Sequence, residues 1–261
     1  FWFKSKAKIK MESISNIKDI FNNTPENKLQ MFIEQYKDDS RQGVANLVKR
    51  AAKKIDDYNK EIERTYKLSE FERKYSDYEF ICGIDEVGRG PLAGPVVAGA
   101  VILPKDCDIL YINDSKKLSA KKREELYEVI MEKAVCAKTA VVSPKVIDEI
   151  NILQATYEAM RQAISMLEPQ PTLLLNDAVN IPGVPMKQVS IIKGDAKSIS
   201  IGAASIIAKV TRDAMMVEYD KIYPEYDFAS NKGYGSAKHI EALKKYGPCP
   251  IHRKSFIHNF I

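Results

Sequence analysis

The sequence predicts an α/β or α+β domain that follows a helical segment. Residues 1–80 contain a single proline, Pro25, and a single glycine, Gly43, between long charged stretches, and this composition favours helices. After residue 80, short β-rich runs alternate with turns and with segments of helical periodicity. We therefore expect a helical extension over residues 11–78 and a second domain over residues 79–261 with a helical C-terminal part. A chain of 261 residues is long enough to bury a sizeable core.

The extension is expected to form a small helical hairpin. Ser40 is a potential N-cap, and the apolar positions after it recur at steps of three and four, at Val44, Leu47, Val48, Ala51, Ile55, Tyr58 and Ile62. The opposite face carries Lys49, Arg50, Lys53, Lys54, Lys60 and Arg64. A weaker helical segment, Lys28–Tyr36, precedes this helix. We interpret the basic residues 1–10 as a non-native or extended tail and assign them no function.

The second domain is expected to contain strands alternating with helices. Strands are predicted near Phe80–Asp85, Val96–Leu103, Lys138–Val142, Thr172–Leu175 and Val189–Ile192. Helices are predicted over Ser119–Ala134, Val146–Leu167, Ser200–Tyr219 and His239–Tyr246. The first half of the segment from Ser200 to Tyr219 is small and apolar, which indicates a helix packed closely against the sheet.

The composition indicates a globular protein of a reducing compartment. The four cysteines are scattered singly, which supports neither a zinc ribbon nor a disulfide scaffold, so the cytoplasm is the expected location. No apolar run approaches the roughly 18 residues that a membrane span needs, and no membrane association is expected. The formal net charge of +5 permits a polyanionic partner without establishing one, because association depends on where charges cluster.

Acidic residues follow three of the apolar strands. Asp85 and Glu86 end the first strand and a glycine-rich turn follows, while Asp177 and Asp195 come after two later strands. A charge at the end of a buried strand is costly unless a cation or hydrogen-bond donors meet it. Each acid alone also fits an ordinary turn, but the recurrence favours one site for a hard cation such as Mg²⁺ or Mn²⁺.

Basic and aromatic residues in turns form a second group. Phosphate contacts are possible at Arg89, Asn113, Lys116, Lys193, Lys197, Lys209 and Arg212, although a solvated surface explains any one of them. Tyr234 lies between two glycines, where it can stack on a sugar or a base or pack on its own loop. His239 is expected to begin a helix, and residues 252–256 are expected to form a basic surface turn.

Several motifs in one order resemble the ribonuclease HII family. They are GIDEVGRGPLAG from Gly83, NDSKKLS from Asn113, KGDAK from Lys193, AASIIAKVTRD from Ala203, KGYG from Lys232 and HRKSF from His252. The resemblance covers roughly residues 80–261. It implies an RNase H-like fold, with a mixed five-stranded sheet flanked by helices behind the small helical extension. The implied partners are RNA–DNA hybrids and duplex DNA with embedded ribonucleotides, which such enzymes cleave during DNA replication and repair.

The resemblance also implies roles for individual residues. Asp85, Glu86, Asp177 and Asp195 match the acids that hold two divalent ions, normally Mg²⁺ or Mn²⁺. Gly88, Arg89 and Gly90 match the element that recognises the ribose 2′-hydroxyl, and Tyr234 matches the tyrosine that packs on the sugar at the RNA-to-DNA junction. Asn113, Lys116, Lys209 and Arg212 are expected to contact phosphates. A monomer is expected.

Some positions depart from the family pattern. Asn176 precedes the third acid in an unusual setting, although the interval to Asp195 fits the family, and Cys249 and Pro250 replace a more usual polar pair. The helical extension is absent from the shortest members. Two rival interpretations are a non-catalytic hybrid-binding module and a ribonuclease HIII, whose sheet-containing N-terminal domain the strand-poor extension does not resemble.

Overall fold

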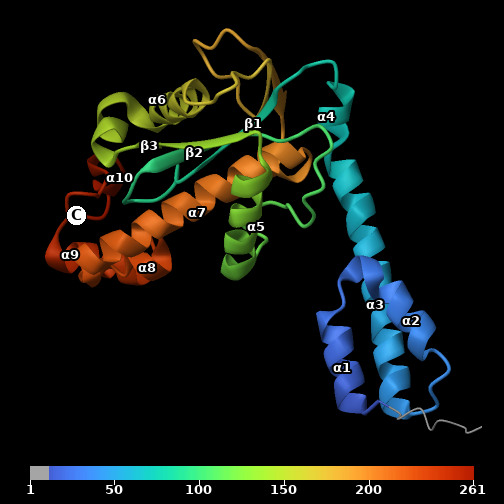
Figure 1. Ribbon diagram of the computed structural model, residues 1–261. Helices are drawn as coiled ribbons and strands as arrows, with labels where there is room; N and C mark the ends of the chain where they lie inside the picture. The colour runs from blue at the N-terminus through green and yellow to red at the C-terminus, as the bar shows by residue number, and fades with distance from the viewer. Residues whose placement is uncertain (1–11) are drawn as a thin grey trace, which may run out of the picture. The chain divides into compact units, whose positions relative to one another are not determined.

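A computed structural model describes residues 12–261 and divides the chain into two compact units between Arg64 and Thr65 (Figure 1). The predicted tail at residues 1–10 lies outside the described residues. The division comes earlier than the boundary after residue 78 that composition indicates, because helix α4 (Glu70–Lys74) belongs to the second unit. Each unit has its own core.

The N-terminal unit is helical, as predicted. It contains α1 (Ile14–Asn23), a 3₁₀ turn η1 (Glu26–Lys28), α2 (Leu29–Tyr36) and the first part of α3 (Gln42–Leu68). Their apolar faces form one core, with buried Ile17, Phe21, Leu29, Phe32, Tyr36, Val44, Leu47 and Ala51. Helix α3 begins two residues after the predicted cap Ser40, and the carbonyl of Arg41 accepts its first bonds from Val44 and Ala45.

The basic face of α3 is exposed, as the helical spacing predicts. Lys49, Arg50, Lys53, Lys54 and Lys60 all face solvent. Two of these cations, Arg50 and Lys54, lie 5.0 and 4.8 Å from the centre of the buried Phe21 ring. Their charges are therefore held on the surface by cation–π contacts and by the packing of their aliphatic stems.

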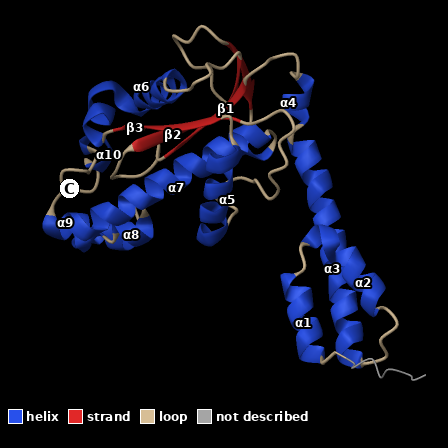
Figure 2. Cartoon of the chain, viewed as in Figure 1, coloured by secondary structure: helices blue, strands red, loops and turns tan. Residues whose placement is uncertain are grey.

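The second unit is built on a mixed five-stranded sheet (Figure 2). The strands are β1 (Ile81–Val87), β2 (Val96–Ile102), β3 (Cys136–Val142), β4 (Leu173–Asp177) and β5 (Lys187–Ile191). Their order is β3-β2-β1-β4-β5; the first three pair antiparallel, and β4 runs parallel to both β1 and β5. The five predicted strands and the predicted mixed sheet are confirmed.

Strand β1 continues past the predicted end at Asp85. On one side β2 pairs with it as far as Val87, so Glu86 is still part of the strand. On the other side the pairing with β4 stops at Ile84 and Asn176. The sheet therefore opens between β1 and β4 from Asp85 and Asp177 onward, whereas the pairing of β1 with β2 continues to Val87.

Helices cover both faces of the sheet. Helix α6 (Pro144–Ser165) packs on one face, and α7 (Ile199–Ile222) with α5 (Ala120–Lys133) packs on the other. A Cβ atom on Gly83 would lie 2.1 Å from the backbone of Ser200, and one on Gly99 would lie 2.3 Å from the carbonyl oxygen of Ala204. The backbone of α7 thus lies directly on β1 and β2, as its small residues predict.

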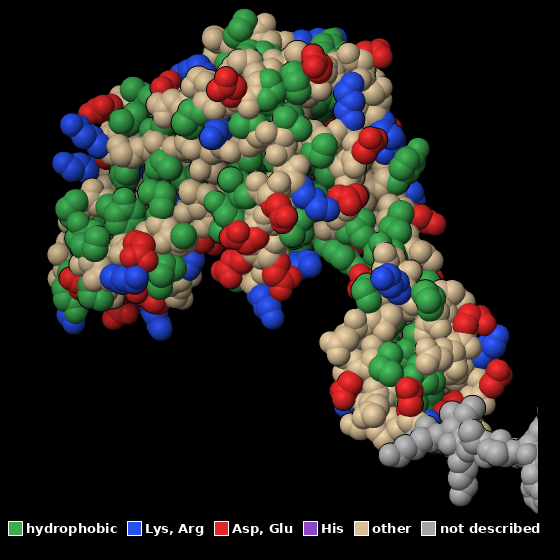
Figure 3. All heavy atoms as spheres, viewed as in Figure 1, with side chains coloured by type: hydrophobic (Ala, Val, Ile, Leu, Met, Phe, Trp, Pro, Cys, Tyr) green, Lys and Arg blue, Asp and Glu red, His purple; other side chains and the backbone are tan. Residues whose placement is uncertain are grey.

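Short elements complete the C-terminal part. They are η2 (Gly194–Ala196), η3 (Pro224–Tyr226), α8 (Phe228–Asn231), α9 (Ala237–Tyr246) and α10 (Lys254–Ile257). Within residues 12–261, no helix is both long enough and apolar enough to cross a membrane. On the face drawn in Figure 3, acidic and basic side chains are interspersed with apolar ones over both units.

Candidate active site

The sheet topology brings three strand-end acids together. Ile84 pairs with Asn176 in the parallel ladder, so the next residues, Asp85 and Asp177, extend from neighbouring strands at the same edge. The backbone N–H of Gly194 donates to Oδ1 of Asp177 at 2.7 Å. This bond fixes the η2 turn, and with it Asp195, beside the end of β4.

Mutual repulsion marks these carboxylates as one electrostatic group. Burial raises the pKa of Asp85 well above its usual value, the charges of Glu86 and Asp177 raise it further, and a hydrogen bond from Ser205 opposes the shift. Burial also raises the pKa of Glu86, against the lowering effect of Arg89. The acids have fewer compensating partners than their charges require.

Asp195 belongs to the same group. Burial raises its pKa, and the nearby charges of Asp114 and Asp177 add to the shift, while Lys116 lowers it. Lys116 also lowers the pKa of Glu86, so this exposed lysine lies within electrostatic reach of both acids.

The residue types fit a divalent cation. Carboxylate oxygens are the ligands that Mg²⁺ and Mn²⁺ prefer, and a cation among these acids would relieve the repulsion that raises the pKa of Asp85. Among residues 12–261, no three histidine, cysteine, aspartate or glutamate side chains already converge tightly enough to form a metal-binding group. These carboxylates therefore have the chemistry that a divalent cation requires and lie near one another, but they are not arranged as a preformed metal-binding group.

A loop of fixed shape, residues 88–95, follows the first two acids. Arg253 is completely buried and donates to the carbonyl oxygens of Gly88, Arg89, Gly94 and Pro95 at 2.5–3.2 Å. The interpretation of residues 252–256 as a basic surface turn is wrong for this arginine, because its guanidinium group satisfies loop carbonyls inside the protein. No local sequence signal indicates this, since its partners lie about 160 residues earlier in the chain.

Arg212 supports the same loop from α7. Its side chain is 0% exposed and donates to the carbonyl oxygens of Pro95, Lys232 and Ala93 at 2.9, 2.9 and 3.2 Å. The phosphate contact expected for Arg212 is therefore replaced in this structure by a structural role, because no part of the guanidinium reaches solvent.

Gly88 and Gly90 serve different purposes in the loop. Gly88 has φ of +93°, and a Cβ atom there would lie 2.2 Å from Nε of Arg212. Gly90 is exposed, and the nearest atom to a Cβ there would be Cε1 of Tyr234 at 3.9 Å. Arg89, between these two glycines, is also exposed. Its Nη1 lies 3.4 Å from Oε1 of Glu86, so the exposed part of the loop is in contact with one of the acids.

Tyr234, with 43% of its surface exposed, is held by a pair of buried histidines. Its carbonyl oxygen lies 2.8 Å from Nδ1 of His239, whose Nε2 lies 3.0 Å from Nε2 of His252. The N–H of Cys249 donates to Nδ1 of His252. Nδ1 of His252 therefore accepts, and the protons sit on Nε2 of His252 and Nδ1 of His239, which fixes both tautomers.

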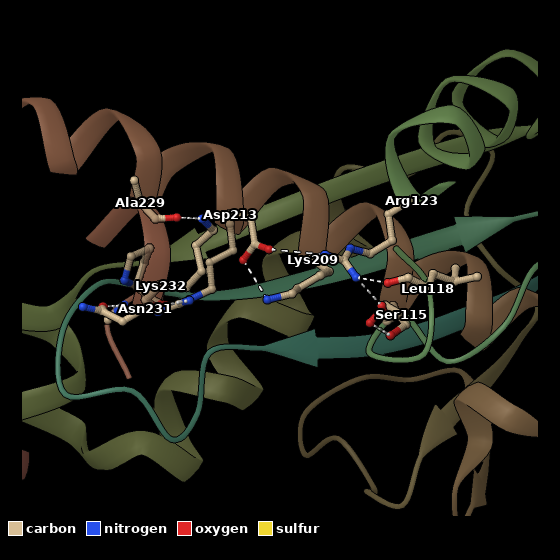
Figure 4. A network of polar contacts seen from close by, with 12 residues as sticks. Ser115, Leu118, Arg123, Lys209, Asp213, Ala229, Asn231 and Lys232 are labelled. Atoms are coloured by element: carbon tan, nitrogen blue, oxygen red, sulfur yellow. Dashed lines mark hydrogen bonds and ion pairs between the residues drawn. The ribbon is translucent and has the colours of Figure 1, made fainter. Parts of the chain in front are cut away.

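A second polar network holds the loop that contains Asn113 and Lys116 (Figure 4). Arg123 donates to the carbonyl oxygens of Ser115 and Leu118 at 2.8 and 2.5 Å. The hydroxyl of Ser115 lies 2.9 Å from that of Ser205, which also bonds Asp85. The loop is thus tied to the acid site through two buried serines that the sequence analysis did not single out.

Lys209 and Asn113 are engaged within the protein. Nζ of Lys209 lies 2.8 Å from Oδ1 of Asp213, and Oδ1 of Asn113 accepts the N–H of Asp114. Burial lowers the pKa of Lys209, while Asp213 opposes that shift. Of Asn113, Lys116, Lys209 and Arg212, only Lys116 is exposed, and its charge lowers the pKa of both Glu86 and Asp195.

Comparison with known proteins agrees with this geometry. The family model for ribonuclease HII matches residues 82–259, and the model for the ribonuclease HII N-terminal domain matches residues 13–76. The ribonuclease HII of Lachnoclostridium phytofermentans is 64% identical over 226 residues, which cover 87% of this chain and 89% of that protein. The ribonuclease HII of Clostridioides difficile is 51% identical over 252 residues, which cover 96% and 99% respectively.

A solved structure extends the likeness to the fold. The ribonuclease H2 from Pyrococcus horikoshii has a TM-score of 0.57 and 30% identity, and the match covers 67% of this chain and 93% of that one. The RNase H-like fold is thereby confirmed, and the helical domain matched at residues 13–76 is that of ribonuclease HII. Acids at the open edge of a mixed sheet, the arginine-held loop beside them and these likenesses lead to one conclusion: the chain belongs to the ribonuclease HII family and is a type HII ribonuclease H endonuclease.

Proposed function

We propose that this enzyme cleaves the RNA strand of RNA–DNA hybrids and cleaves at ribonucleotides embedded in duplex DNA. The observation that carries the proposal is the group of mutually repelling acids, buried Asp85 and its partly buried neighbours, at the open edge of β1 and β4. It lies next in the chain to a loop whose shape is set by buried arginines. A phosphodiester and a ribose are the two chemical features that such a pair of sites can recognise.

Asp85, Glu86, Asp177 and Asp195 would hold two divalent ions, Mg²⁺ or Mn²⁺. When bound, the paired cations supply a water activated for in-line attack on phosphorus and stabilise charge on the leaving 3′ oxygen, which leaves 5′-phosphate and 3′-hydroxyl ends. Lys116 would reduce the net negative charge around the acids before a phosphate arrives. The low exposure of Asp85, at 6%, excludes bulk water from its carboxylate.

The loop at residues 88–90 and Tyr234 would select ribose at the cleavage site. Gly90 leaves its backbone open to close approach, and a 2′-hydroxyl is the group that separates RNA from DNA. The Tyr234 ring lies beside Gly90 and is exposed, so a sugar resting on the ring would meet the loop backbone.

A cleavage assay tests this function. The protein is incubated with an RNA–DNA hybrid, with a duplex carrying one ribonucleotide, and with all-DNA duplex, each with Mg²⁺, Mn²⁺ or a chelator. We expect cuts in the first two substrates only, dependent on the cation and ending in 5′-phosphate. Binding of the hybrid without a nick would contradict the proposal and favour the non-catalytic module.

The basic face of α3 is proposed to strengthen substrate binding. Removing three exposed charges by the combined change Lys49→Gln, Lys53→Gln and Lys60→Gln should weaken duplex affinity. The slope of log affinity against log salt should fall by about 2–3, because each neutralised phosphate contact releases counterions. Lys28→Gln, on the η1 turn, is the control. An unchanged affinity and salt slope would contradict this role.

A further inference from the structure

Glu72 of α4 makes contacts at the start of α7 that neither the acid group nor the arginine-held loop explains. Its Oε1 accepts a hydrogen bond from Oγ of Ser198 at 2.5 Å and another from the N–H of Ser200 at 3.0 Å. The Ser198 hydroxyl in turn accepts from the N–H of Ile201 and so caps α7. Both serines are buried, at 0% and 1% exposure.

Ser198 is also bonded to the turn that carries Asp195. Its N–H donates to the carbonyl oxygen of Gly194 at 2.8 Å, and Gly194 donates to Oδ1 of Asp177 at 2.7 Å. The turn with Asp195 is therefore held between two anchors, the Asp177 carboxylate on one side and the serine bonded to Glu72 on the other. All of these residues belong to the second unit.

The carboxylate of Glu72 occupies its position at an energetic cost. Its Oε2 is buried and makes no hydrogen bond within the described residues, and a buried polar atom left without a partner is unfavourable. The helix is held in place by its neighbours: Phe71 and Tyr75 pack on a cluster formed by Leu173, Leu175, Ile191 and Ile201. Burying a carboxylate here is more costly than burying an apolar residue, which favours a role beyond stability.

We propose that Glu72 is a positioning residue for Asp195. It sets the start of α7 and the η2 turn, so that Asp195 is held beside Asp177 where the two would help to hold a cation, while Glu72 would act through these contacts and not as a ligand. The inference rests on the proposed metal function of these acids. It also gives the end of the N-terminal family domain, which matches residues 13–76, a part in building the active site.

The test compares Glu72→Ala and Glu72→Gln in the full chain with Glu70→Ala, an exposed glutamate on the same helix. Mn²⁺ binding is measured without substrate, from the electron paramagnetic resonance signal of free Mn²⁺, and kcat and KM for a hybrid are measured against Mg²⁺ concentration. We expect Glu72→Ala to weaken Mn²⁺ affinity about 10-fold or more. The Mg²⁺ concentration for half-maximal cleavage should rise by a similar factor, while KM for the hybrid stays unchanged.

Glu72→Gln should have a smaller effect, because its amide oxygen can accept both bonds, and Glu70→Ala should match the unaltered protein. If Glu72→Ala does not fold, Ser198→Ala interrupts the same path and should weaken Mn²⁺ affinity likewise. Mn²⁺ affinities within about two-fold of the Glu70→Ala control would overturn the inference while leaving the proposed function intact. If the unaltered protein neither binds Mn²⁺ nor cleaves, the proposed function and this inference both fail.

Discussion

The acid group and the loop that follows it are neighbours in the chain but are held in opposite ways. Asp85 is buried and Glu86 partly buried, and burial together with nearby negative charge raises the pKa of both. The loop at residues 88–95 has its carbonyl oxygens bonded by two buried arginines, Arg212 and Arg253. The charges of the first region are left partly uncompensated by the protein, whereas the loop carbonyls of the second region are bonded by the protein itself.

This difference separates two kinds of recognition. A metal site can leave charge unbalanced, because the ion that balances it binds only in the folded state and stabilises that state when present. A surface that distinguishes ribose from deoxyribose by the position of its backbone has no such later partner. Its shape must come from the protein, and buried guanidinium groups with several donors in a rigid fork provide it.

The largest effect is expected from Asp85→Asn. Cleavage should fall at least about 100-fold, because the substituted amide removes a charged oxygen ligand, while hybrid binding is retained. Because the pKa of Asp85 is raised in the folded protein, its ionisation opposes folding at any pH above its pKa in the unfolded chain. Without metal, the Asp85→Asn variant should therefore melt at a higher temperature than the unaltered protein. Cleavage assays and thermal unfolding in chelator measure the two effects.

Asp106→Asn, at an exposed loop position, is the matched control and should change neither quantity. Substantial residual cleavage by Asp85→Asn would count against the metal assignment. A lower melting temperature would show that the buried charge is better compensated than its surroundings indicate.

Arg253→Ala tests the opposite region. It removes the donors to four loop carbonyls at once, and the free energy of unfolding should fall by about 3–5 kcal/mol. Arg253→Lys should recover only part of this, because a single ammonium cannot reproduce the fork. Urea denaturation measures the change, and a loss below about 1 kcal/mol would mean that Arg212 alone sets the loop.

Gly88→Ala and Gly90→Ala separate the conformation of the loop from its proposed contact with the substrate. Gly88→Ala should lower stability by about 2 kcal/mol and reduce all cleavage, because its φ is positive and Arg212 occupies the space. Gly90→Ala should leave stability within about 0.5 kcal/mol and lower activity mainly at single ribonucleotides. Parallel denaturation and cleavage assays separate the two, and unchanged discrimination of ribose from deoxyribose by Gly90→Ala would remove its proposed role.

The last prediction concerns the histidine pair behind Tyr234, whose effect is limited to acidic pH. Burial, with a contribution from His239, lowers the pKa of His252 to about 4, so the folded state resists protonation. Neutral His252 therefore contributes to stability at pH values above its pKa in the unfolded chain, which is about 6.5. As the pH falls from there toward 4, about 1–3 kcal/mol of this stability is lost. Between pH 7 and 4, the free energy of unfolding measured by urea denaturation should fall less steeply with pH for His252→Asn than for the unaltered protein. The same pH dependence in both proteins would exclude this contribution.

The local pattern of the sequence was enough to predict the five strands and most of the longer helices, but it did not predict α1, α4, α8 or α10. Periodicity placed the apolar stripe of α3 and the five strands, and the small residues of α7 predicted its close contact with the sheet at Gly83 and Gly99. The length of β1 was underestimated, because pairing with β2 carries the strand past Asp85 despite the charges. Recurrence of acids after strands identified the four residues whose role stays a prediction.

What the sequence determined by itself was the set of elements and the residues that could carry chemistry, because helical and strand periodicity, turns and strand-end acids are local signals. Only the tertiary structure decided which side chains support the site. Arg253 looked like a surface residue and Arg212 like a phosphate contact, yet both are buried beneath the loop. Glu72 acts on α7 across 126 residues of chain. Such contacts form only when segments that are distant in the sequence pack against one another, and local sequence patterns carry no information about that packing.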